Sequence, residues 1–493
     1  MKKVTDSSKF KGRSGKVARR SFLAQAGTAV LAAGGLASLH ASQGHEPTGR
    51  ADRNSSGCDY DVIVIGGGFA GVTAARDCRE NGLSTLLLEA KGRLGGRTLT
   101  SQYEGVQVEL GGTWIHWSQP FVWAEVQRYG LEVKETPGFA AERMIALVDG
   151  KPVDVGEAEY VEIVAAYQAL TTDARAVLER PYDLRHSWNR VLEADRISAA
   201  QRLDQLDLGP LARDAMDGLV GSMAHNRPEA MSYLDVLRWA ALGAYNDFAF
   251  MMDAVGRFQL KDGTSKLIEQ MVADGRPEVR LSTAVAKVED LGERVRVTTH
   301  SGEVITAASA IVTVPMNVLD RIEFSPTLPT GAIEAGKDGH TGQGNKVYFR
   351  LAGQYGKLFA LGPADQPISS FWTYHEGEDH TLMVAFNNDR SALEQVTREA
   401  VQASVRKYLP GAVVDSIYSY DWVIDPFARG TYPSYRPGWI NNYYDDFQKD
   451  LGRVCFASGD HGEGWRGFID GAIGAGTRAA QRVNHKLNEH TGP

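Results

Sequence analysis

A regular pattern of apolar residues begins near residue 60, where a short β-branched run predicts a buried strand. Tyr60–Ile65 is almost wholly apolar and is followed at once by glycines, as expected for a strand buried in a parallel sheet. Residues 70–81 have helical spacing, and Gly82 is expected to end that helix. A second apolar run, Thr85–Leu88, predicts the next strand. The order strand, helix, strand indicates an α/β domain.

The glycines between the first strand and the helix match a dinucleotide-binding turn. Gly66, Gly68 and Gly71 have the G-x-G-x-x-G spacing, which permits a tight turn, close approach to a pyrophosphate, and close packing of helix on strand. The N–H groups at the start of the helix would face the phosphates. Glu89 ends the second strand, where an acidic residue binds ribose hydroxyls and disfavours the 2′-phosphate of NADP.

Further glycine-rich stretches favour FAD over a nicotinamide cofactor. The sequence RLGGR, from Arg93 to Arg97, follows Glu89 almost directly, and a nicotinamide-binding domain has no need of a second turn there. A flavoprotein needs it because the chain must follow the flavin diphosphate, whose charge the arginines can neutralise. Residues 109–114 (ELGGTW) and 458–472 contain two more such turns. The set of stretches predicts an FAD site.

The pattern elsewhere indicates two interleaved domains. Residues 157–250 have helical periodicity, whereas 347–351 and 381–386 alternate as strands do, and 392–409 predicts a helix stopped by Pro410. The predicted fold is α/β, with a discontinuous FAD-binding domain and an α+β substrate domain. The FAD-binding domain is assigned to 58–135, 256–330 and 425–487, and the substrate-binding domain to 136–255 and 331–424.

Composition and charge limit the class of function. With 43% hydrophobic and 23% charged residues, the chain is typical of a soluble globular enzyme. A formal net charge of −8 argues against nucleic acid as a partner. The three cysteines, Cys58, Cys78 and Cys455, form no C-x-x-C pair, so neither a disulfide framework nor a metal site is expected, and Cys78 and Cys455 are predicted to be buried.

The N-terminus predicts export. A basic region precedes Arg19-Arg20-Ser21-Phe22-Leu23, and an apolar segment rich in alanine and glycine follows to about Ala41. The segment is too short and too rich in small residues for a membrane span, and the paired arginines indicate a twin-arginine signal. We therefore expect a signal peptide at 1–41, a linker at 42–57, the twin-arginine (Tat) export machinery as a partner, and a periplasmic location.

The chain resembles the flavin amine oxidase family over residues 59–487, and within it the nicotine-degrading bacterial branch. The resemblance is carried by 60–76, by VELGGTW at 108–114 and by GWRGFIDGA at 464–472. It implies a Rossmann-like FAD-binding domain of the monoamine oxidase type. It also implies hydride transfer from an amine to the flavin, giving an imine that water hydrolyses to a carbonyl and a smaller amine. The substrate it implies is pseudooxynicotine, with nicotine as the alternative.

The resemblance also assigns roles to single residues. Lys346 matches the lysine that holds a water near flavin N5, and Trp422 matches a tryptophan beside the flavin. Tyr432, ten positions later, and Phe468 match the two rings of an aromatic cage, and many relatives have tyrosine in place of Phe468. Thr431 stands where monoamine oxidases have the cysteine that attaches FAD. Threonine cannot form a thioether, so non-covalent FAD is expected.

Three more cofactor contacts follow from the same resemblance. Asp460 matches the contact to the ribityl chain, Ile469 a backbone N–H facing the flavin pyrimidine, and Val285 a contact on the adenine side. The predicted cofactor-binding residues are Gly66, Gly68, Phe69, Ala70, Gly71, Glu89, Ala90, Arg93, Gly96, Arg97, Gly111, Gly112, Thr113, Trp114, Val285, Trp422, Gly459, Asp460, Gly467, Phe468 and Ile469.

The sequence leaves several alternatives open. A nicotinamide-dependent dehydrogenase would share the first glycine motif, and a non-catalytic flavin-binding protein would share all of them. The electron acceptor is either oxygen or a periplasmic c-type cytochrome. Neither the amine substrate nor the oligomeric state, monomer or homodimer, is fixed by the sequence.

Overall fold

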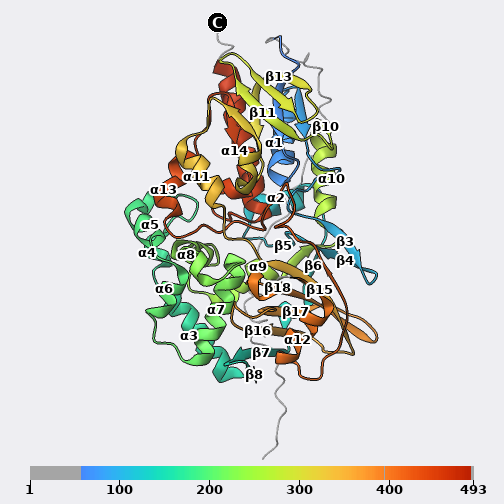
Figure 1. Cartoon of the computed structure of the whole chain (residues 1–493), viewed down its shortest axis with the longest axis vertical. Coiled ribbons are helices and arrows are strands. Elements are labelled where there is room, and N and C mark those ends of the chain that lie inside the picture. Colours follow the sequence, from blue (N-terminus) through green and yellow to red (C-terminus); the bar gives the residue numbers. More distant parts are fainter. Residues whose placement is uncertain (1–56, 394, 490–493) are drawn as a thin grey trace, which may run out of the picture. The chain divides into compact units, whose positions relative to one another are not determined.

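The computed structural model describes residues 57–393 and 395–489 (Figure 1). The predicted signal peptide at 1–41 and the predicted linker, except for its last residue, lie outside the described residues. Within the described part, no helix combines the length and apolar character needed to cross a membrane.

An eight-stranded sheet forms around the predicted dinucleotide-binding strands. β1 (Tyr60–Ile65) and β2 (Thr85–Leu88) have the bounds that the sequence predicts and pair in parallel. The strand order is β10-β2-β1-β13-β12-β11-β14, and β20 pairs with β13. The other strands of this sheet are β10 (Glu278–Arg280), β11 (Val285–Asp290), β12 (Val295–Thr299), β13 (Val304–Val312), β14 (Glu323–Ser325) and β20 (Val454–Phe456).

Helices from distant parts of the chain pack beside this sheet. α1 (Phe69–Glu80), which contains the predicted helix almost residue for residue, packs against α14 (Ile469–Glu489) and α10 (Thr264–Gly275). Figure 1 shows α1 and α14 side by side. The two helices come so close at Gly476 that only glycine fits there, since a Cβ would lie 2.3 Å from the carbonyl oxygen of Ala70. α2 (Pro120–Arg128) also packs against α14.

A second, seven-stranded sheet belongs to the predicted substrate domain. Its order is β19-β15-β18-β17-β16-β7-β8, and it includes the strands predicted at 347–351 and 381–386. The sequence did not predict β7 and β8, which enter the sheet because β7 pairs in parallel with the distant β16. The strands are β7 (Arg143–Val148), β8 (Lys151–Asp154), β15 (Asn345–Ala352), β16 (Leu358–Leu361), β17 (Ser370–Glu376), β18 (His380–Asn387) and β19 (Val414–Ser419).

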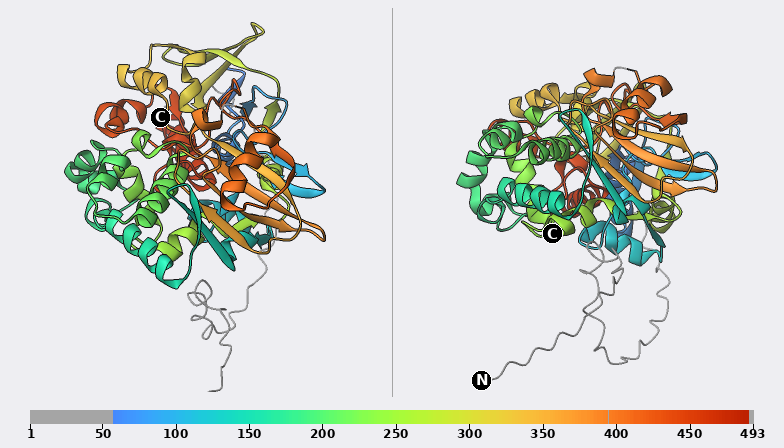
Figure 2. Two further views of the ribbon diagram at one scale, coloured as in Figure 1. Left: turned by 60° about the horizontal axis from the view of Figure 1, so that its bottom comes forward. Right: turned by 90° about the horizontal axis from the view of Figure 1, so that it is seen from below.

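The predicted helical region at 157–250 is confirmed. Its helices group on one side of Figure 2, opposite the strands β15 to β18. They are α3 (Glu157–Leu170), α4 (Ala174–Val177), α5 (Trp188–Asp195), α6 (Ala199–Asp204), α7 (Pro210–Ala224), α8 (Tyr233–Leu242) and α9 (Phe248–Gly256).

The helix predicted at 392–409 starts later than expected. α12 runs from Arg398 to Tyr408 because the Thr397 hydroxyl accepts a hydrogen bond from the Ala400 N–H, at 3.2 Å, and caps the helix. The predicted start at Ala392 lies instead in a separate 3₁₀ turn, Arg390–Leu393. The expectation was wrong at this end because apolar spacing continued through the capping residue.

Shorter elements complete the fold. β3 and β4 form a hairpin, and β5, β9 and β6 form a small sheet. The remaining elements are β3 (Thr100–Tyr103), β4 (Val106–Glu109), β5 (Trp114–Ile115), β6 (Val133–Glu135), β9 (Phe258–Leu260), α11 (Thr330–Asp338), α13 (Trp439–Phe447), η1 (Pro137–Ala140), η2 (Leu184–Ser187), η3 (Pro228–Ala230), η4 (Met316–Arg321) and η6 (Gly459–His461).

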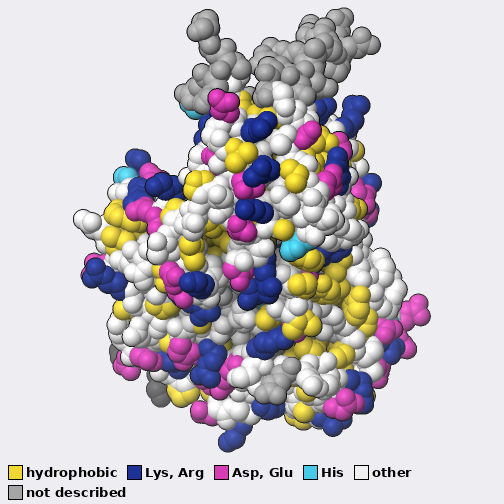
Figure 3. Space-filling view, turned by 45° about the horizontal axis from the view of Figure 1, so that its top comes forward, with side chains coloured by type: hydrophobic (Ala, Val, Ile, Leu, Met, Phe, Trp, Pro, Cys, Tyr) yellow, Lys and Arg dark blue, Asp and Glu magenta, His cyan; other side chains and the backbone are white. Residues whose placement is uncertain are grey.

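The cysteines and the surface agree with the composition. Cys78 and Cys455 are buried, as predicted. On the face drawn in Figure 3, Lys and Arg side chains are interspersed with Asp and Glu. Among the residues that the structure describes, no group of three or more His, Cys, Asp or Glu could hold a metal ion.

Candidate active site

The first glycine turn joins β1 to α1 with no room for a side chain at Gly66 or Gly71. Gly66 has φ +106°, a conformation that favours glycine. A Cβ on Gly71 would lie 1.8 Å from the carbonyl oxygen of Gly66, so the helix packs directly on the turn. Gly68 caps α1 without a side-chain hydrogen bond. Phe69 and Ala70, both predicted cofactor contacts, are buried in the first turn. The backbone N–H groups at this helix start are therefore suited to an anionic ligand.

The second glycine turn lies against the first. Gly68 and Gly95 form a parallel bridge, and a Cβ on Gly96 would lie 3.1 Å from the Cα of Gly68. The Arg93 guanidinium donates to the carbonyls of Leu94, Gly96 and Thr98, within 3.1 Å. Arg93 therefore stabilises the shape of this turn. A contact between Arg93 and a phosphate of the cofactor stays a prediction.

Glu89 lies where β2 ends and links the adjacent turns. Its carboxylate accepts hydrogen bonds from the N–H of Gly67 at 2.6 Å and of Lys91 at 2.7 Å. Burial raises the pKa of Glu89, while these two N–H groups act to lower it. Its carbonyl accepts from the Thr283 N–H at 2.8 Å, which brings the segment before Val285 beside it. Glu89 and the segment before Val285, the predicted contacts to the ribose and to the adenine side, are thus neighbours. Ala90, another predicted cofactor contact, lies between Glu89 and Lys91.

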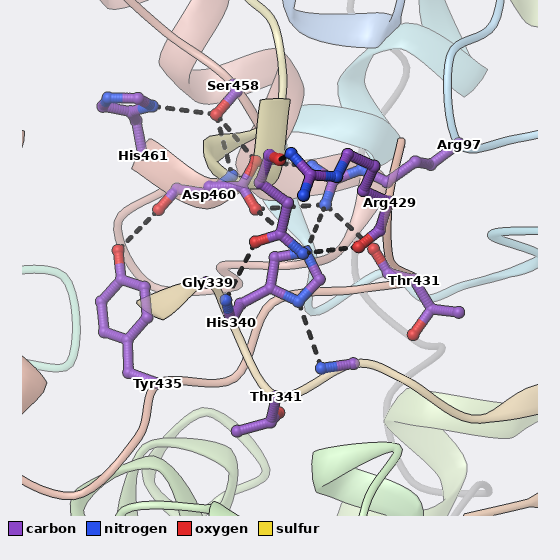
Figure 4. Close-up of polar contacts among 12 residues, drawn as sticks. Arg97, Gly339, His340, Thr341, Arg429, Thr431, Tyr435, Ser458, Asp460 and His461 are labelled. Atoms are coloured by element: carbon purple, nitrogen blue, oxygen red, sulfur yellow. Dashed lines mark hydrogen bonds and ion pairs between the residues drawn. The ribbon is translucent and has the colours of Figure 1, made fainter. Parts of the chain in front are cut away.

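The partly buried Arg97 forms an ion pair with the buried Asp460 (Figure 4). The Arg97 Nη2 lies 2.7 Å from one Asp460 carboxylate oxygen, and Nη1 lies 3.1 Å from the other. Nη1 also donates to the Thr431 carbonyl at 2.9 Å. Burial would raise the pKa of Asp460, but Arg97 and His340 lower it to about 2. The ion pair therefore joins the second glycine turn to Thr431 and to the Gly459–His461 turn; contacts of Arg97 and Asp460 with the cofactor stay predictions.

Lys346 is a buried lysine in the interior of the seven-stranded sheet. Lys346 is on β15, a strand that lies between β18 and β19 in the sheet, and the residue is 6% exposed. Its Nζ donates to the carbonyls of Glu109, at 3.2 Å, and Gly111, at 2.5 Å, and to the Thr113 hydroxyl, at 2.6 Å. Burial lowers the pKa of Lys346 to about 7, against a smaller raising effect of Glu109. The lysine thus ties β15 to the Glu109–Thr113 segment and can change protonation near neutral pH.

Trp422 is buried beside the same Gly111 segment. Its Nε1 donates to the Leu110 carbonyl at 2.9 Å, and a Cβ on Gly111 would lie 3.0 Å from its ring. Gly112 lies near Ile469, the first residue of α14, because a Cβ on Gly112 would be 3.7 Å from the Ile469 side chain. The segment therefore brings Lys346, Trp422 and the start of α14 together, and a role for these residues at the flavin stays a prediction.

Tyr432 and Phe468 lie on adjoining segments. A Cβ on Gly467 would be 3.1 Å from the carbonyl oxygen of Pro433, so the residues next to the two rings are in contact. The Tyr432 hydroxyl donates to the Ser222 carbonyl. Phe468 contacts the ring of Trp239, with centroids 5.0 Å apart. Both rings are only partly buried, which suits a pair that holds a ligand; the cage itself stays a prediction.

His225 is a site residue that the sequence reasoning missed. Its ring stacks on Tyr432, with centroids 5.0 Å apart and planes at 2°, and its Nδ1 lies 2.8 Å from the Thr431 hydroxyl oxygen. Burial lowers the pKa of His225 to about 3, so the ring is neutral. It supports Tyr432 from behind. Its signal in the sequence is weak, because nothing near His225 marks the C-terminal end of α7 as a neighbour of residue 432.

A row of aromatic rings extends this region across the seven-stranded sheet. Trp114 contacts Trp372, with centroids 5.4 Å apart, and Phe386 at 6.1 Å. Phe386 in turn lies 5.2 Å from the ring of His225. The Lys346 Nζ lies 4.6 Å from the centroid of the Trp114 ring. The lysine is therefore bordered by aromatic surface that continues to Tyr432.

These observations fit FAD. The cradle at Gly66, Gly68 and Gly71 allows backbone N–H groups to approach a pyrophosphate. Glu89 supplies a carboxylate at the position suited to ribose hydroxyls. The second turn continues from the first toward Arg97 and Asp460. A site for one dinucleotide would therefore be formed by turns from four separate stretches of the chain.

Residues 69–484 match the family of flavin containing amine oxidoreductases, and the chain belongs to this family. It is 41% identical over 476 residues to pseudooxynicotine dehydrogenase from Pseudomonas sp, covering 95% of each chain. It is 36% identical over 473 residues to nicotine dehydrogenase from Pseudomonas putida, covering 95% of this chain and 98% of that one. The structure of wild-type putrescine oxidase bound to putrescine is similar in fold, with TM-score 0.75 and 23% identity, covering 86% and 98%.

The family assignment confirms the predicted fold and enzyme class. The chain is a flavin-dependent amine oxidoreductase that acts on CH–NH bonds, with FAD as the cofactor of the family. A nicotinamide-dependent dehydrogenase is thereby excluded as the class of this protein.

Proposed function

We propose that this enzyme oxidises the secondary amine pseudooxynicotine to a pyridyl keto-aldehyde, 3-succinoylsemialdehyde-pyridine, and methylamine. The proposal is carried by the buried Lys346 on the Gly111 segment, together with the adjoining segments that bear Tyr432 and Phe468. The choice of substrate is supported by the relative at 41% identity over nearly the whole chain. Nicotine is the second candidate, supported by the relative at 36% identity.

Bound FAD supplies the acceptor for a hydride from the carbon beside nitrogen. The chain's own residues bind and orient the amine. The faces of Tyr432 and Phe468 attract a substituted amine, and His225 and Trp239 fix these rings from behind. A site bordered by apolar rings favours the neutral, reactive form of the amine. Loss of a hydride and a proton leaves an imine, and addition of water then releases the aldehyde and methylamine.

Lys346 contributes a proton-holding group at Nζ. Because its pKa is about 7, it is partly neutral at physiological pH and can hold a water or exchange a proton with one. Its three acceptors keep Nζ in one place.

The proposal is tested by the visible spectrum of the purified protein without oxygen, before and after pseudooxynicotine is added. The flavin band is expected to bleach rapidly, and product analysis is expected to show methylamine. A band that bleaches with nicotine but not with pseudooxynicotine would favour nicotine, the second candidate, as the substrate. A band that no amine bleaches would contradict the proposed function and favour a non-catalytic flavin-binding protein.

We propose further that FAD is bound without a covalent link. Thr431 lacks a thiol, and its hydroxyl is engaged with His225 at 2.8 Å. Precipitating the enzyme with acid is expected to leave the flavin in the supernatant and a colourless pellet. A yellow pellet that keeps its flavin after washing and proteolysis would show an attachment at another residue.

Export and electron acceptor form a separate proposal. Arg19 and Arg20 are proposed to direct the folded, FAD-loaded enzyme through the Tat machinery to the periplasm. Reoxidation there is proposed to use oxygen or a c-type cytochrome. Fractionation of cells tests the location, and stopped-flow mixing of the reduced enzyme with each acceptor tests the choice.

A further inference from the structure

The segments that carry the two cage rings are both attached to one carboxylate. Asp235 lies on α8, and its Oδ2 accepts a hydrogen bond from the Tyr435 N–H at 2.5 Å, three residues after Tyr432. Its Oδ1 accepts from the guanidinium of Arg466, two residues before Phe468. One side chain from a third element therefore bonds to both cage-bearing segments.

A second arginine completes the attachment. Arg238, one turn further along α8, donates from Nε to Asp235 at 3.1 Å and from Nη1 to the Gly464 carbonyl at 2.8 Å. Asp235, Arg238 and Arg466 are all buried. Burial alone would raise the pKa of Asp235, but Arg466 and Arg238 hold it below its usual range. The carboxylate is therefore ionised, and its bonds to the guanidinium groups are charge-assisted.

No regular secondary structure fixes the distance between the two segments. Residues 431–436 and 462–468 contain neither helix nor strand, so no ladder of backbone hydrogen bonds sets their separation. They meet where Gly467 approaches Pro433. Beyond that approach, Tyr435 contributes a second link, since its hydroxyl donates to the Asp460 carbonyl at 2.7 Å and its ring lies 3.5 Å from the Arg466 guanidinium carbon (Figure 4 shows the Tyr435 hydroxyl directed at Asp460).

We propose that Asp235 is a positioning residue that sets the separation and angle of the Tyr432 and Phe468 rings. The use of those rings to hold an amine rests on the proposed function; the attachment itself does not. Movement of one segment relative to the other would misalign the amine, and a misplacement of about 1 Å can lower a rate by roughly 10²-fold.

The test compares Asp235→Asn with a matched control, Glu125→Gln. Glu125 forms a buried ion pair with Arg76 at 2.6 Å, between α1 and α2 rather than between the cage segments. Both variants are loaded with FAD and studied below their unfolding temperatures. Two quantities are measured: hydrogen exchange of peptides covering 431–436 and 464–468, and the rate and amine Kd of anaerobic flavin reduction with the best wild-type substrate.

In Asp235→Asn, hydrogen exchange in both segments is expected to become about tenfold faster or more. The rate of flavin reduction is expected to fall by about tenfold or more. In Glu125→Gln, exchange is expected to rise only around α1 and α2, and the reduction rate to stay within about twofold of wild type. Wild-type exchange in both segments of Asp235→Asn would overturn the proposal. Faster exchange with an unchanged reduction rate and Kd would also overturn it.

A charge-balanced variant covers the case in which Asp235→Asn does not fold. The native cluster has two guanidinium groups and one carboxylate, and the double variant Asp235→Asn with Arg238→Gln keeps the same net charge with Arg466 alone. The same results are expected of it. If no amine reduces wild-type enzyme, the proposed function fails, while the exchange measurement still decides whether Asp235 holds the two segments.

Discussion

Replacing Gly71 with alanine is expected to remove nearly all bound FAD. The new Cβ would lie 1.8 Å from the Gly66 carbonyl oxygen and 2.7 Å from the Thr313 hydroxyl. Neither the backbone oxygen nor the start of α1 can move without opening the turn that faces the cofactor. Overpacking of this kind costs about 1–3 kcal/mol or more, and it falls on the groups that would bind the pyrophosphate.

The measurement is the ratio of flavin to protein absorbance after purification with added FAD. We expect the ratio of Gly71→Ala to fall by about tenfold or more, with a lower unfolding temperature. Gly92→Ala is the matched control, because its Cβ would meet only the Ser282 hydroxyl at an ordinary 3.7 Å. Full flavin content in Gly71→Ala would contradict the assignment of this turn to the cofactor.

Replacing Lys346 with methionine is expected to slow flavin reduction by about 10²-fold, the lower end of the usual contribution of acid–base groups. The change removes the only group in the described site whose pKa burial lowers to about 7. It also leaves the Glu109 and Gly111 carbonyls without their Nζ donor. The reduction rate of the wild-type enzyme is expected to vary with pH around about 7, and this component is expected to disappear in the variant.

The same substitution has a defined effect on stability. Lys346 releases its proton near pH 7 in the folded protein, whereas an unfolded lysine does so near its ordinary value of 10.5. Between these values the unfolded chain binds more protons, so the contribution of Lys346 to stability rises with pH in this window. Lys346→Met is expected to flatten that rise in urea unfolding of the apoprotein.

Lys134→Met is the control for the rate measurement. Lys134 is a half-buried lysine on β6, and burial also lowers its pKa. It donates no hydrogen bond to the Gly111 segment among the described contacts. The rate of flavin reduction in Lys134→Met is expected to stay within about twofold of wild type. An equal loss of rate in both variants would remove the special role of Lys346.

Local sequence signals were sufficient for the dinucleotide turn. Tyr60–Ile65 and Thr85–Leu88 are short apolar runs bounded by glycine or an acid, and both strands have the predicted bounds. Lys346 was identified only through resemblance to a family, and its burial depends on neighbours far along the chain. Periodicity cannot supply such neighbours, because it describes one element at a time.

The features that sequence reasoning missed all depend on distant contacts. β7 becomes a strand by pairing with β16, more than two hundred residues away. His225 directly follows α7 and Asp235 lies on α8, in segments that would be interpreted as core. Only the folded chain places His225 behind Tyr432 and Asp235 between the cage segments. Arg97 was expected at a phosphate, and its pairing with Asp460 requires the C-terminal turn to be in place.

The strand order of the large sheet has a consequence for synthesis of the enzyme. β20, from residue 454, completes the sheet beside β13, and α14, from residue 469, packs on α1. A nascent chain shorter than these residues therefore lacks one strand of the large sheet and the helix that packs on α1. We therefore expect FAD to be captured only after β20 and α14 have been synthesised and have packed.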